Sequence, residues 1–388
     1  MAEFTELMET IRAEEASRER LFQGDGRGVR TFARRATPQY KAHLAEAATL
    51  VAQVYEGRRP LRVLMEAMTT SDFPLLFGDI LDRQLLAGYQ ETAVIWPRIA
   101  RRATVRDFRT VNRFTMDGAE SVFDTVPEQA EYPAAALTEG RYQYAVQKRG
   151  RRIPFSWEAM INDDLDALKD IPQRFARASR RSESRFVTEL YVDANGPHAS
   201  LYTVGNANIV TSNPVLSVAA LQTAFTVLAA QTDVDGEPIE IEMVTLVVPP
   251  ALEVTALNIL NAVQIELAEA GGTSNQKVWA QNWMRNRLEL VVDPYIPIVA
   301  SSANGNTMWA LFANPTVGRP ALELGFLRGF EQPQIFIKSP NAQRVGGGNA
   351  DPMDGDFDTD SIQYKARHVF GGARMDPKMT VASQGDGS

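Results

Sequence analysis

The sequence predicts an α+β fold built from several parts, and three observations lead to this prediction. Apolar residues recur with the helical period before residue 90 and again over 163–193. Between these runs, 104–114 and 141–147 alternate with a period of two, which is typical of strands. The second half mixes helical and strand-like runs and ends in strands. A chain of 388 residues, 44% of them hydrophobic, suggests two or three domains.

The first 60 residues predict an N-terminal arm. Helical patterns over 1–23 and 38–57 are separated by a glycine-rich break at 24–28. Both patterns are charged and contain few large apolar residues, so we expect residues 1–60 to pack on another molecule and to lie outside the core. Residues 61–103 are expected to lead into the next domain through a helix that ends near Gly88.

A long β-hairpin is expected over 104–152. Its strands are the alternating runs 104–114 and 141–147, and its connection is the acidic segment 117–139. A connection of this length without a strong pattern of its own is usually a functional loop or a disordered segment. We therefore treat the hairpin tip as a candidate contact region.

A long helix is expected over about 170–193, inside a domain of residues 153–212. Pro172 is tolerated only in a first turn, and Asn195-Gly196 ends the pattern. The side chains expected to face inward are Phe175, Ala178, Phe186 and Leu190. Those expected to face outward are Arg174, Arg177, Arg180, Arg181 and Arg185.

Residues 213–318 predict an α/β domain, and 319–388 predict a strand-rich end. Ser217 is expected to cap a helix, and a second helix is expected over 252–267. The expected strands are 239–248, 287–299, 307–313, 326–338 and 361–370.

Charge is distributed in blocks, although the net charge is only −8. Residues 98–113 carry six arginines, 117–139 carry six acids and no base, and 141–152 carry five bases and no acid. A further segment, 186–276, has ten acids and no Lys or Arg. Single blocks are usually solvated faces, but three alternating blocks favour pairing between copies of the chain. The 33 arginines against 7 lysines fit protein contacts or an arginine-rich coding preference equally well.

No cofactor or metal site is expected. The chain has no cysteine, which excludes disulfides and thiolate chemistry, and it has no phosphate-binding glycine loop. The cluster Asp163, Asp164 and Asp166 has two interpretations: carboxylates that stabilise a helix start, or the site of a carboxylate-dependent hydrolase. Helix capping is favoured, because no apolar pocket is evident that would raise one pKa. The first residues are acidic, unlike a signal peptide, and no apolar run reaches the ~18 residues of a membrane span.

An ordered set of segments resembles one family. The segments are DFPLLFGDILDRQLLAGY (72–89), VRDFRTV (105–111), VPEQAEYP (126–133), GRRIPFSWEAMINDDLDALKDIPQRFARASRRSES (150–184) and YKARHVFGGARMDPK (364–378). In this order they resemble the major capsid proteins of tailed bacteriophages, and more narrowly the branch of the Mu-like phage major head subunit. The resemblance covers about 72–380 and is weaker over the first 60 residues.

The resemblance implies a Hong Kong 97-type capsid fold. Its parts would be the arm, the extended hairpin loop over 104–152, a peripheral domain of 153–212 and 319–388 with a long spine helix, and an axial domain of 213–318. It implies a non-enzymatic protein that self-assembles into pentamers and hexamers of an icosahedral shell around double-stranded DNA. Portal and scaffolding or decoration proteins would be partners, no membrane would be involved, and assembly would take place in the host cytoplasm.

The charge blocks then indicate which residues contact a neighbouring subunit. On the hairpin tip these are Asp117, Glu120, Asp124, Glu128, Glu131 and Glu139. On the basic side they are Arg101, Arg102, Arg106, Arg149, Arg151, Arg152, Arg177 and Arg181. Some relatives join subunits by a Lys–Asn isopeptide bond from this hairpin, but here no Lys lies between Lys41 and Lys148. The alternatives left open are a soluble hydrolase that uses the aspartate cluster, and another head structural or decoration protein.

Overall fold

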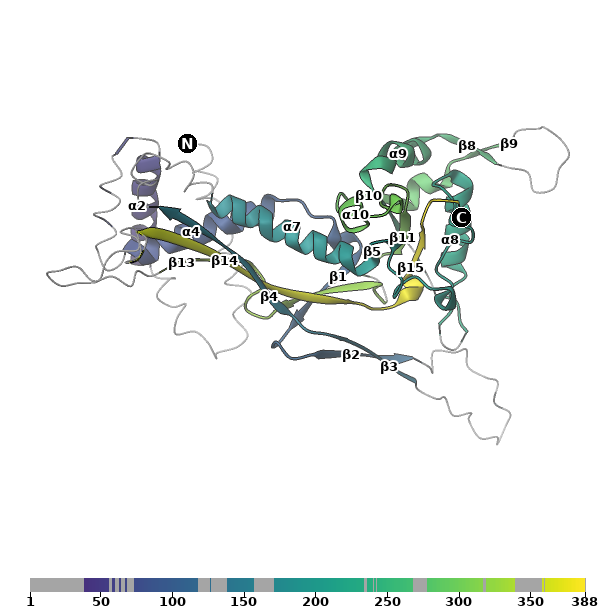
Figure 1. Ribbon diagram of the computed structural model, residues 1–388, viewed down its shortest axis with the longest axis horizontal. Coiled ribbons are helices and arrows are strands. Elements are labelled where there is room, and N and C mark those ends of the chain that lie inside the picture. Colours follow the sequence, from purple (N-terminus) through teal and green to yellow (C-terminus); the bar gives the residue numbers. More distant parts are fainter. Residues whose placement is uncertain are drawn as a thin grey trace. The chain divides into compact units, whose positions relative to one another are not determined.

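The structure is a computed structural model (Figure 1). It describes residues 38–55, 73–117, 138–156, 171–267 without 234, 235, 240 and 242, 278–338 without 317 and 318, and 360–387, together with the isolated residues 58, 59, 63, 67, 126 and 358. These residues form helices and sheets, which confirms the predicted α+β class. No helix in these ranges combines the length and the apolar character needed to cross a membrane.

The described residues form two compact units. Unit 1 takes its residues from 1–92, 150–179 and 332–368, and unit 2 takes its residues from 93–149, 180–331 and 369–388. Three elements contribute residues to both units: β4 (Gln147–Ser156), α7 (Ile171–Tyr191) and β14 (Ser361–Arg374).

Among its described residues, unit 1 also contains two helices and one strand. These are α2 (Pro38–Tyr55), α4 (Phe73–Glu91) and β13 (Gln334–Ile337). β13 pairs antiparallel with the first part of β14. α4 does not end near Gly88 as expected but continues to Glu91. A Cβ at Gly88 would lie 3.2 Å from the Cβ of Ala176, so this glycine permits close packing of α4 on the first turns of α7.

The prediction that residues 1–60 lie outside the core is wrong for α2. Leu44, Val51 and Val54 of α2 are buried in the same apolar cluster as Leu81 and Leu85 of α4. Among the described side chains of α2, two of the five buried ones are alanines, Ala47 and Ala48, so its inward face gives a weaker apolar stripe than one built of large side chains.

Unit 2 contains part of a mixed sheet in which β12 (Leu322–Leu327) lies between two neighbours. β1 (Ala100–Val105) runs parallel to β12, and the second part of β14 runs antiparallel to it. The expected strand 326–338 is therefore two strands, β12 and β13, joined through a turn at Gly329 with φ of +82°. β14 begins at the expected position and continues four residues beyond it.

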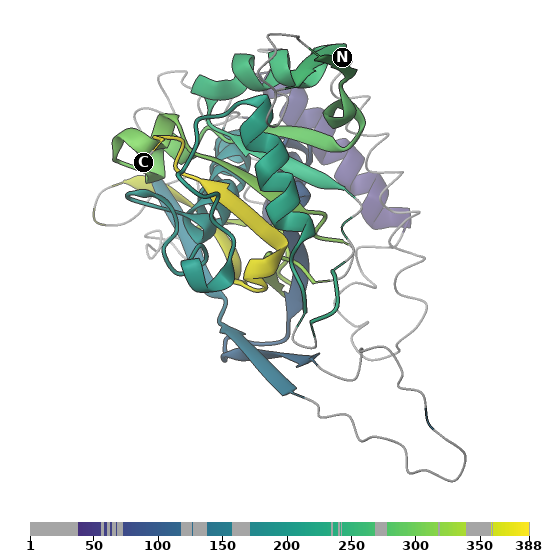
Figure 2. The ribbon, with the colours of Figure 1, turned by 90° about the vertical axis from the view of Figure 1, so that its right-hand side faces the viewer.

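A second sheet of unit 2 has the strand order β10-β7-β11-β15. Its strands are β7 (Val244–Val248), β10 (Leu288–Val292), β11 (Trp309–Ala313) and β15 (Thr380–Ser383). The C-terminal strand β15 thus pairs with β11 and not with the strands of 319–374. On one face, Leu246 and Leu311 pack with α8 (Val218–Ala229) and α9 (Glu253–Asn261), and Figure 2 shows α8 beside β15.

The opposite face of this sheet packs against the end of α7. Val247 and Phe312 share one apolar cluster with Val187 and Tyr191 of α7 and with Ile296 of α10 (Ile296–Val299). The sheet is therefore covered by helices on both faces, which explains why all five residues of β7 and of β11 are buried. Ser217 caps α8 by accepting a hydrogen bond from the Ala220 N–H, as predicted.

Two expectations in this region are wrong. The helix expected over 252–267 ends at Asn261, and 264–267 form β8 (Gln264–Leu267), which pairs with β9 (Val278–Gln281). The strands expected over 239–248 and 287–299 are shorter, because only β7 and β10 form the ladder. The remaining short elements are the strands β5 (Val192–Asp193) and β6 (Gly196–Pro197) and the 3₁₀ helices η1 (Trp96–Arg98), η2 (Val204–Asn206), η3 (Pro250–Leu252), η4 (Trp283–Asn286), η5 (Ala303–Asn306) and η6 (Pro377–Met379).

The predicted hairpin is present, but its strands differ from those expected. β2 (Val111–Asp117) pairs antiparallel with β3 (Thr138–Tyr144). The run 104–114 is not one strand, because β1 ends at Val105 and a turn precedes Val111. Period-two alternation continued across this turn by coincidence, so the pattern alone did not reveal the break.

Candidate contact surface

The acidic residues predicted at the hairpin tip fall mostly outside the described residues. Asp117 closes β2 opposite Thr138, and Glu139 lies in β3 opposite Met116. The remaining four are Glu120, Asp124, Glu128 and Glu131, which the structure does not describe. The described part of this surface is therefore the root of the hairpin and its basic surroundings.

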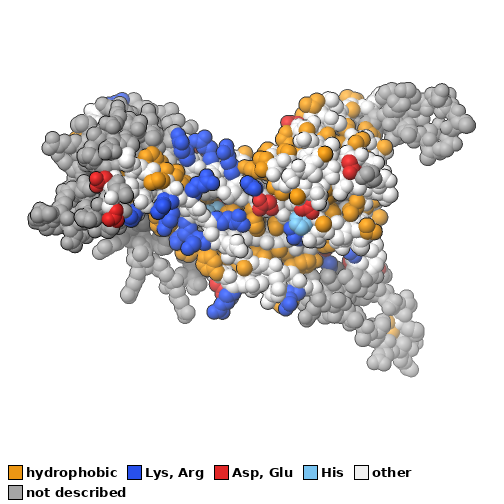
Figure 3. All heavy atoms as spheres, viewed as in Figure 1, with side chains coloured by type: hydrophobic (Ala, Val, Ile, Leu, Met, Phe, Trp, Pro, Cys, Tyr) orange, Lys and Arg blue, Asp and Glu red, His pale blue; other side chains and the backbone are white. Residues whose placement is uncertain are grey.

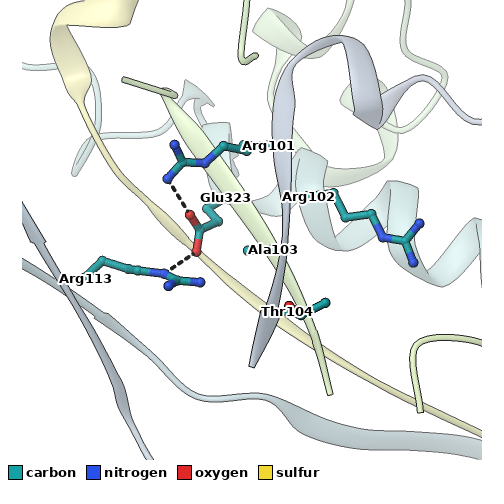
Figure 4. Close-up of a pocket in the computed structure, with 6 residues that line it drawn as sticks. All are labelled: Arg101, Arg102, Ala103, Thr104, Arg113 and Glu323. Atoms are coloured by element: carbon teal, nitrogen blue, oxygen red, sulfur yellow. Dashed lines mark hydrogen bonds and ion pairs between the residues drawn. The ribbon is translucent and has the colours of Figure 1, made fainter. Parts of the chain in front are cut away.

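A buried carboxylate lies at the root of the hairpin (Figure 4). Glu323 of β12 is 1% exposed, and its Oε2 accepts a hydrogen bond of 2.9 Å from Arg101 Nη2 on β1. Its Oε1 accepts bonds from Arg113 Nε on β2, at 2.9 Å, and from the Tyr144 hydroxyl on β3, at 2.6 Å. We call these four residues the Glu323 node. It joins both strands of the hairpin to the sheet of unit 2.

The node is consistent with an ionised glutamate. Burial alone would raise the pKa of Glu323, but the hydrogen bonds from Tyr144, Arg101 and Arg113 outweigh it and lower the pKa. Burial and the neighbouring carboxylate raise the pKa of Tyr144, so its hydroxyl stays a donor at neutral pH. A charge with three donors is compensated well enough to remain buried.

Two glycines make room for the hairpin root. A Cβ at Gly325 would lie 2.5 Å from the Tyr144 hydroxyl oxygen, so the tyrosine ring occupies the space above this residue. A Cβ at Gly371 of β14 would overlap the carbonyl of Ala145. At the end of β3, the chain therefore lies directly against the backbone of the sheet strands.

Most other arginines of 98–113 also have partners within the chain. Arg98 forms an ion pair with Glu289 at 3.1 Å, and Arg102 forms one with Glu331 at 3.0 Å. In Figure 4 the Arg102 side chain points away from Glu323. Arg106 is exposed and forms no ion pair with any residue that the structure describes.

Arg149 lies between aromatic rings. Its guanidinium carbon is 4.6 Å from the ring centre of Phe186 on α7 and 4.8 Å from that of Phe370 on β14. Its buried Nε forms no hydrogen bond with any of the described residues. These ring contacts hold the cation in place and stabilise it by interaction with the π faces. Nearby, Arg151 and Arg152 are exposed, and Arg152 bonds to Gln363 at 3.3 Å.

The long helix α7 carries an exposed basic stripe. The exposed arginines are Arg174, Arg177, Arg181 and Arg185, spaced three or four residues apart as one helix face requires. Lys and Arg side chains are prominent over this helix in Figure 3. The expectation that Arg180 faces outward is wrong: it is 15% exposed and bonds at 3.3 Å to Glu183, which also accepts from Trp96 Nε1 at 3.0 Å.

The described ranges contain no candidate metal centre. No three His, Asp or Glu side chains there are grouped closely enough to hold a metal ion. Asp163, Asp164 and Asp166 lie outside the described residues. Sequence reasoning missed Glu323 and Asp293, which are both fully buried. The signal for Glu323 is a single acid inside the apolar run of β12, which is expected to be charged only when it has partners.

No curated protein matches the sequence. Among solved structures, similar chains include the capsid of an empty GTA particle (11% identity, TM-score 0.46, 75% of this chain and 91% of that one) and Mycobacterium phage Patience (13%, 0.45, 83% and 91%). A virus-like particle from Pyrococcus furiosus is also similar (10%, 0.42, 79% and 99%).

A match to a family profile shows to which protein family the chain belongs. The profile described as phage capsid protein matches residues 141–383, well over half of the chain. The match starts in β3 and ends in β15, so it includes α7, the sheet β10-β7-β11-β15, and β12 and β14 of the mixed sheet, but not β1. This chain therefore belongs to the phage capsid protein family and is a structural component of the virion.

Proposed function

We propose that this chain is the major subunit of an icosahedral phage head with the Hong Kong 97-type fold. Copies would assemble as pentamers and hexamers and enclose double-stranded DNA. The observation that carries the proposal is the family match over 141–383. The order of elements supports it: a hairpin (β2–β3), a long helix (α7), a helix-covered sheet and a returning strand (β14) follow one another as the resemblance implies.

The domain plan belongs to the same proposal. The hairpin loop would comprise 104–152, the axial domain 213–318, and the peripheral domain 153–212 with 319–388. The position of β15 beside β11 supports one change, in which the last residues join the axial sheet. The narrower likeness to the Mu-like branch remains a prediction.

Contacts between copies would join the acidic hairpin tip to arginines of a neighbour. The best candidates are exposed arginines without an ion pair to described residues, namely Arg106, Arg151, Arg152, Arg177 and Arg181. Arg101 and Arg102 already bind glutamates of their own chain, and Arg149 lies between rings. Each exposed pair would contribute only about 0–1 kcal/mol, but repetition over a shell multiplies the effect.

Charge reversal at the tip tests this proposal. The purified protein should form shells that are visible by negative-stain microscopy. Replacing Asp124, Glu128 and Glu131 with Lys should weaken shell formation, most strongly at low salt, where charges are least screened. A matched control replaces Glu46, Glu91 and Asp358, which are exposed outside the hairpin, with Lys. Normal shells from the tip variant at low ionic strength would disprove the pairing.

The rival functions have different outcomes in the same experiment. A decoration subunit would bind to preformed shells and form none alone. A hydrolase would stay monomeric under all salt conditions and lose activity on Asp163→Asn. The portal, scaffolding or decoration partners and assembly in the host cytoplasm belong to the proposal as properties of such heads.

A further inference from the structure

The hairpin β2–β3 has little support along its length. Of its described side chains, only Tyr144 is buried, and Phe114 is 62% exposed. Its two strands form a sheet of their own and pair with no other described strand. A two-stranded hairpin alone is at best marginally stable in water. The direction in which it extends from the mixed sheet must therefore be set at its root.

The apolar part of the root is small. Tyr144 and Val146 pack with Val105, Leu327 and Val369 in one buried cluster. Such packing is non-directional and fixes a position better than an orientation. A directional contact further along the hairpin is needed to prevent rotation about this cluster.

The Glu323 node supplies that contact at two places. Tyr144 faces Val111 at the first rung of the hairpin, and Arg113 faces Tyr142 at the third. Two residues along a strand separate these rungs by about 7 Å. Both donors bind the same oxygen, Oε1 of Glu323, from opposite strands. Two attachments at different heights resist rotation that a single attachment would permit.

The anchor itself is fixed. Glu323 lies in β12, paired with Arg101 of β1 on one side and with Ala373 of β14 on the other. Arg101 also holds the second carboxylate oxygen, so the carboxylate cannot turn (Figure 4). The space above Gly325 receives the Tyr144 ring. The sheet thus holds the carboxylate in place, and the hydrogen bonds that the hairpin donates to it form only in one direction of the hairpin.

We propose that Glu323 is the positioning residue that fixes the direction of the hairpin relative to the sheet of unit 2. It would thereby present the acidic segment 117–139 to a second copy of the chain. This last step rests on the proposed shell function, whereas the positioning itself does not.

The absence of cysteine makes a direct test possible. Arg141→Cys on β3 and Arg328→Cys after β12 place two spin labels on exposed sites, one on the hairpin and one beside the sheet. Their distance is measured by pulsed electron paramagnetic resonance on the unassembled protein. We expect a single narrow distribution in this double-cysteine protein.

Glu323→Gln should abolish the narrow distribution. An amide has one accepting oxygen and an NH2 group, so it cannot accept bonds at both ends as the carboxylate does. Losing one charge-assisted bond corresponds to a roughly 10- to 100-fold weaker preference for the anchored direction. Tyr144→Phe keeps the ring over Gly325 and removes one bond, and it should broaden the distribution to a smaller extent. Glu289→Gln, which removes the ion pair with Arg98 in the same unit, should leave the distribution narrow.

The outcomes separate positioning from assembly. A narrow distribution in both Glu323→Gln and Tyr144→Phe would overturn the proposal, and Tyr144→Phe decides the matter if Glu323→Gln does not fold. Shell formation, followed by light scattering, should be slower in the variants with broad distributions than in Glu289→Gln. Broad distributions with assembly at the wild-type rate would overturn the link to the second copy. Failure of the wild-type protein to form shells would refute the proposed function and leave the distance result intact.

Discussion

Asp293 offers the sharpest test of how unit 2 holds α7 against its neighbouring sheet. This fully buried carboxylate follows β10 and accepts three hydrogen bonds. The hydroxyls of Thr188 and Tyr191 on α7 both donate to Oδ2 at 2.6 Å, and the Tyr295 N–H donates to Oδ1 at 2.8 Å. Tyr191→Phe keeps the ring, which is in edge contact with Phe312, and removes only one of these bonds.

The magnitude follows from the charge of the acceptor. A hydrogen bond to a charged group contributes about 1.5–3 kcal/mol, and one between neutral groups about 0.5–1.5 kcal/mol. Tyr202→Phe is the matched control, because its equally buried hydroxyl bonds to that of Thr380 at 2.9 Å. Unfolding free energies from urea titrations of the unassembled protein, followed by circular dichroism, should fall more for Tyr191→Phe than for Tyr202→Phe.

The pH dependence provides a second criterion. Burial raises the pKa of Asp293 above its ordinary value, although the bonds from Thr188, Tyr191 and Tyr295 oppose the shift. The folded protein thus binds this proton more tightly than the unfolded chain, so the carboxyl adds stability as the pH falls through its folded-state pKa. The cost of Tyr191→Phe should shrink over the same range, because the acceptor becomes neutral. Equal and pH-independent costs for the two variants would refute the assignment of a charged acceptor.

Three further predictions concern other parts of the chain. Because the pKa of Glu323 is lowered, its contribution to stability is present above about pH 4.5 and is lost as the pH falls further. In Glu323→Gln, the unfolding free energy should therefore decrease less steeply as the pH is lowered below about 4.5. Gly371→Ala should leave little soluble protein because its Cβ would overlap a backbone carbonyl, whereas Gly205→Ala, with only a side-chain atom 3.9 Å away, should express normally. Deleting residues 1–60 should lower the melting temperature, since each of Leu44, Val51 and Val54 contributes about 1.5–3 kcal/mol by burial. Deleting 1–37 leaves α2 in place and serves as the control. An unchanged melting temperature after deletion of 1–60 would show that α2 is not part of the core.

The sequence predicted the elements whose pattern is local. The α7 helix and the Ser217 cap follow from apolar spacing and from one hydroxyl, and both lie where expected. It failed where the outcome depends on distant partners. Arg180 and Arg181 are adjacent and chemically alike, yet only Arg180 turns inward, because Glu183 lies one turn along and Trp96 approaches it from another segment.

The same reason explains why the Glu323 node was not predicted. Its members Arg101, Arg113, Tyr144 and Glu323 are brought together by the pairing of β1 with β12 and by the return of the hairpin. Residue separations of 179 to 222 along the chain carry no periodic signal. A buried acid in an apolar strand shows that partners must exist, but only the sheet register identifies them.

The basic segments of the chain differ in how many of their residues form ion pairs with described acids. In 98–113, five of the six arginines form ion pairs with acids of their own chain, and two of these, Arg101 and Arg113, join β1 and β2 to Glu323 of β12. In 141–152, no base forms an ion pair with a described acid, and on the exposed stripe of α7 Arg185 pairs with Glu189 at 3.0 Å. A neighbour's carboxylate meets less competition at the second block and on α7 than at the first. We therefore expect the acidic hairpin tip of another copy to bind there rather than at the first block, whose Arg101 and Arg113 already bind Glu323.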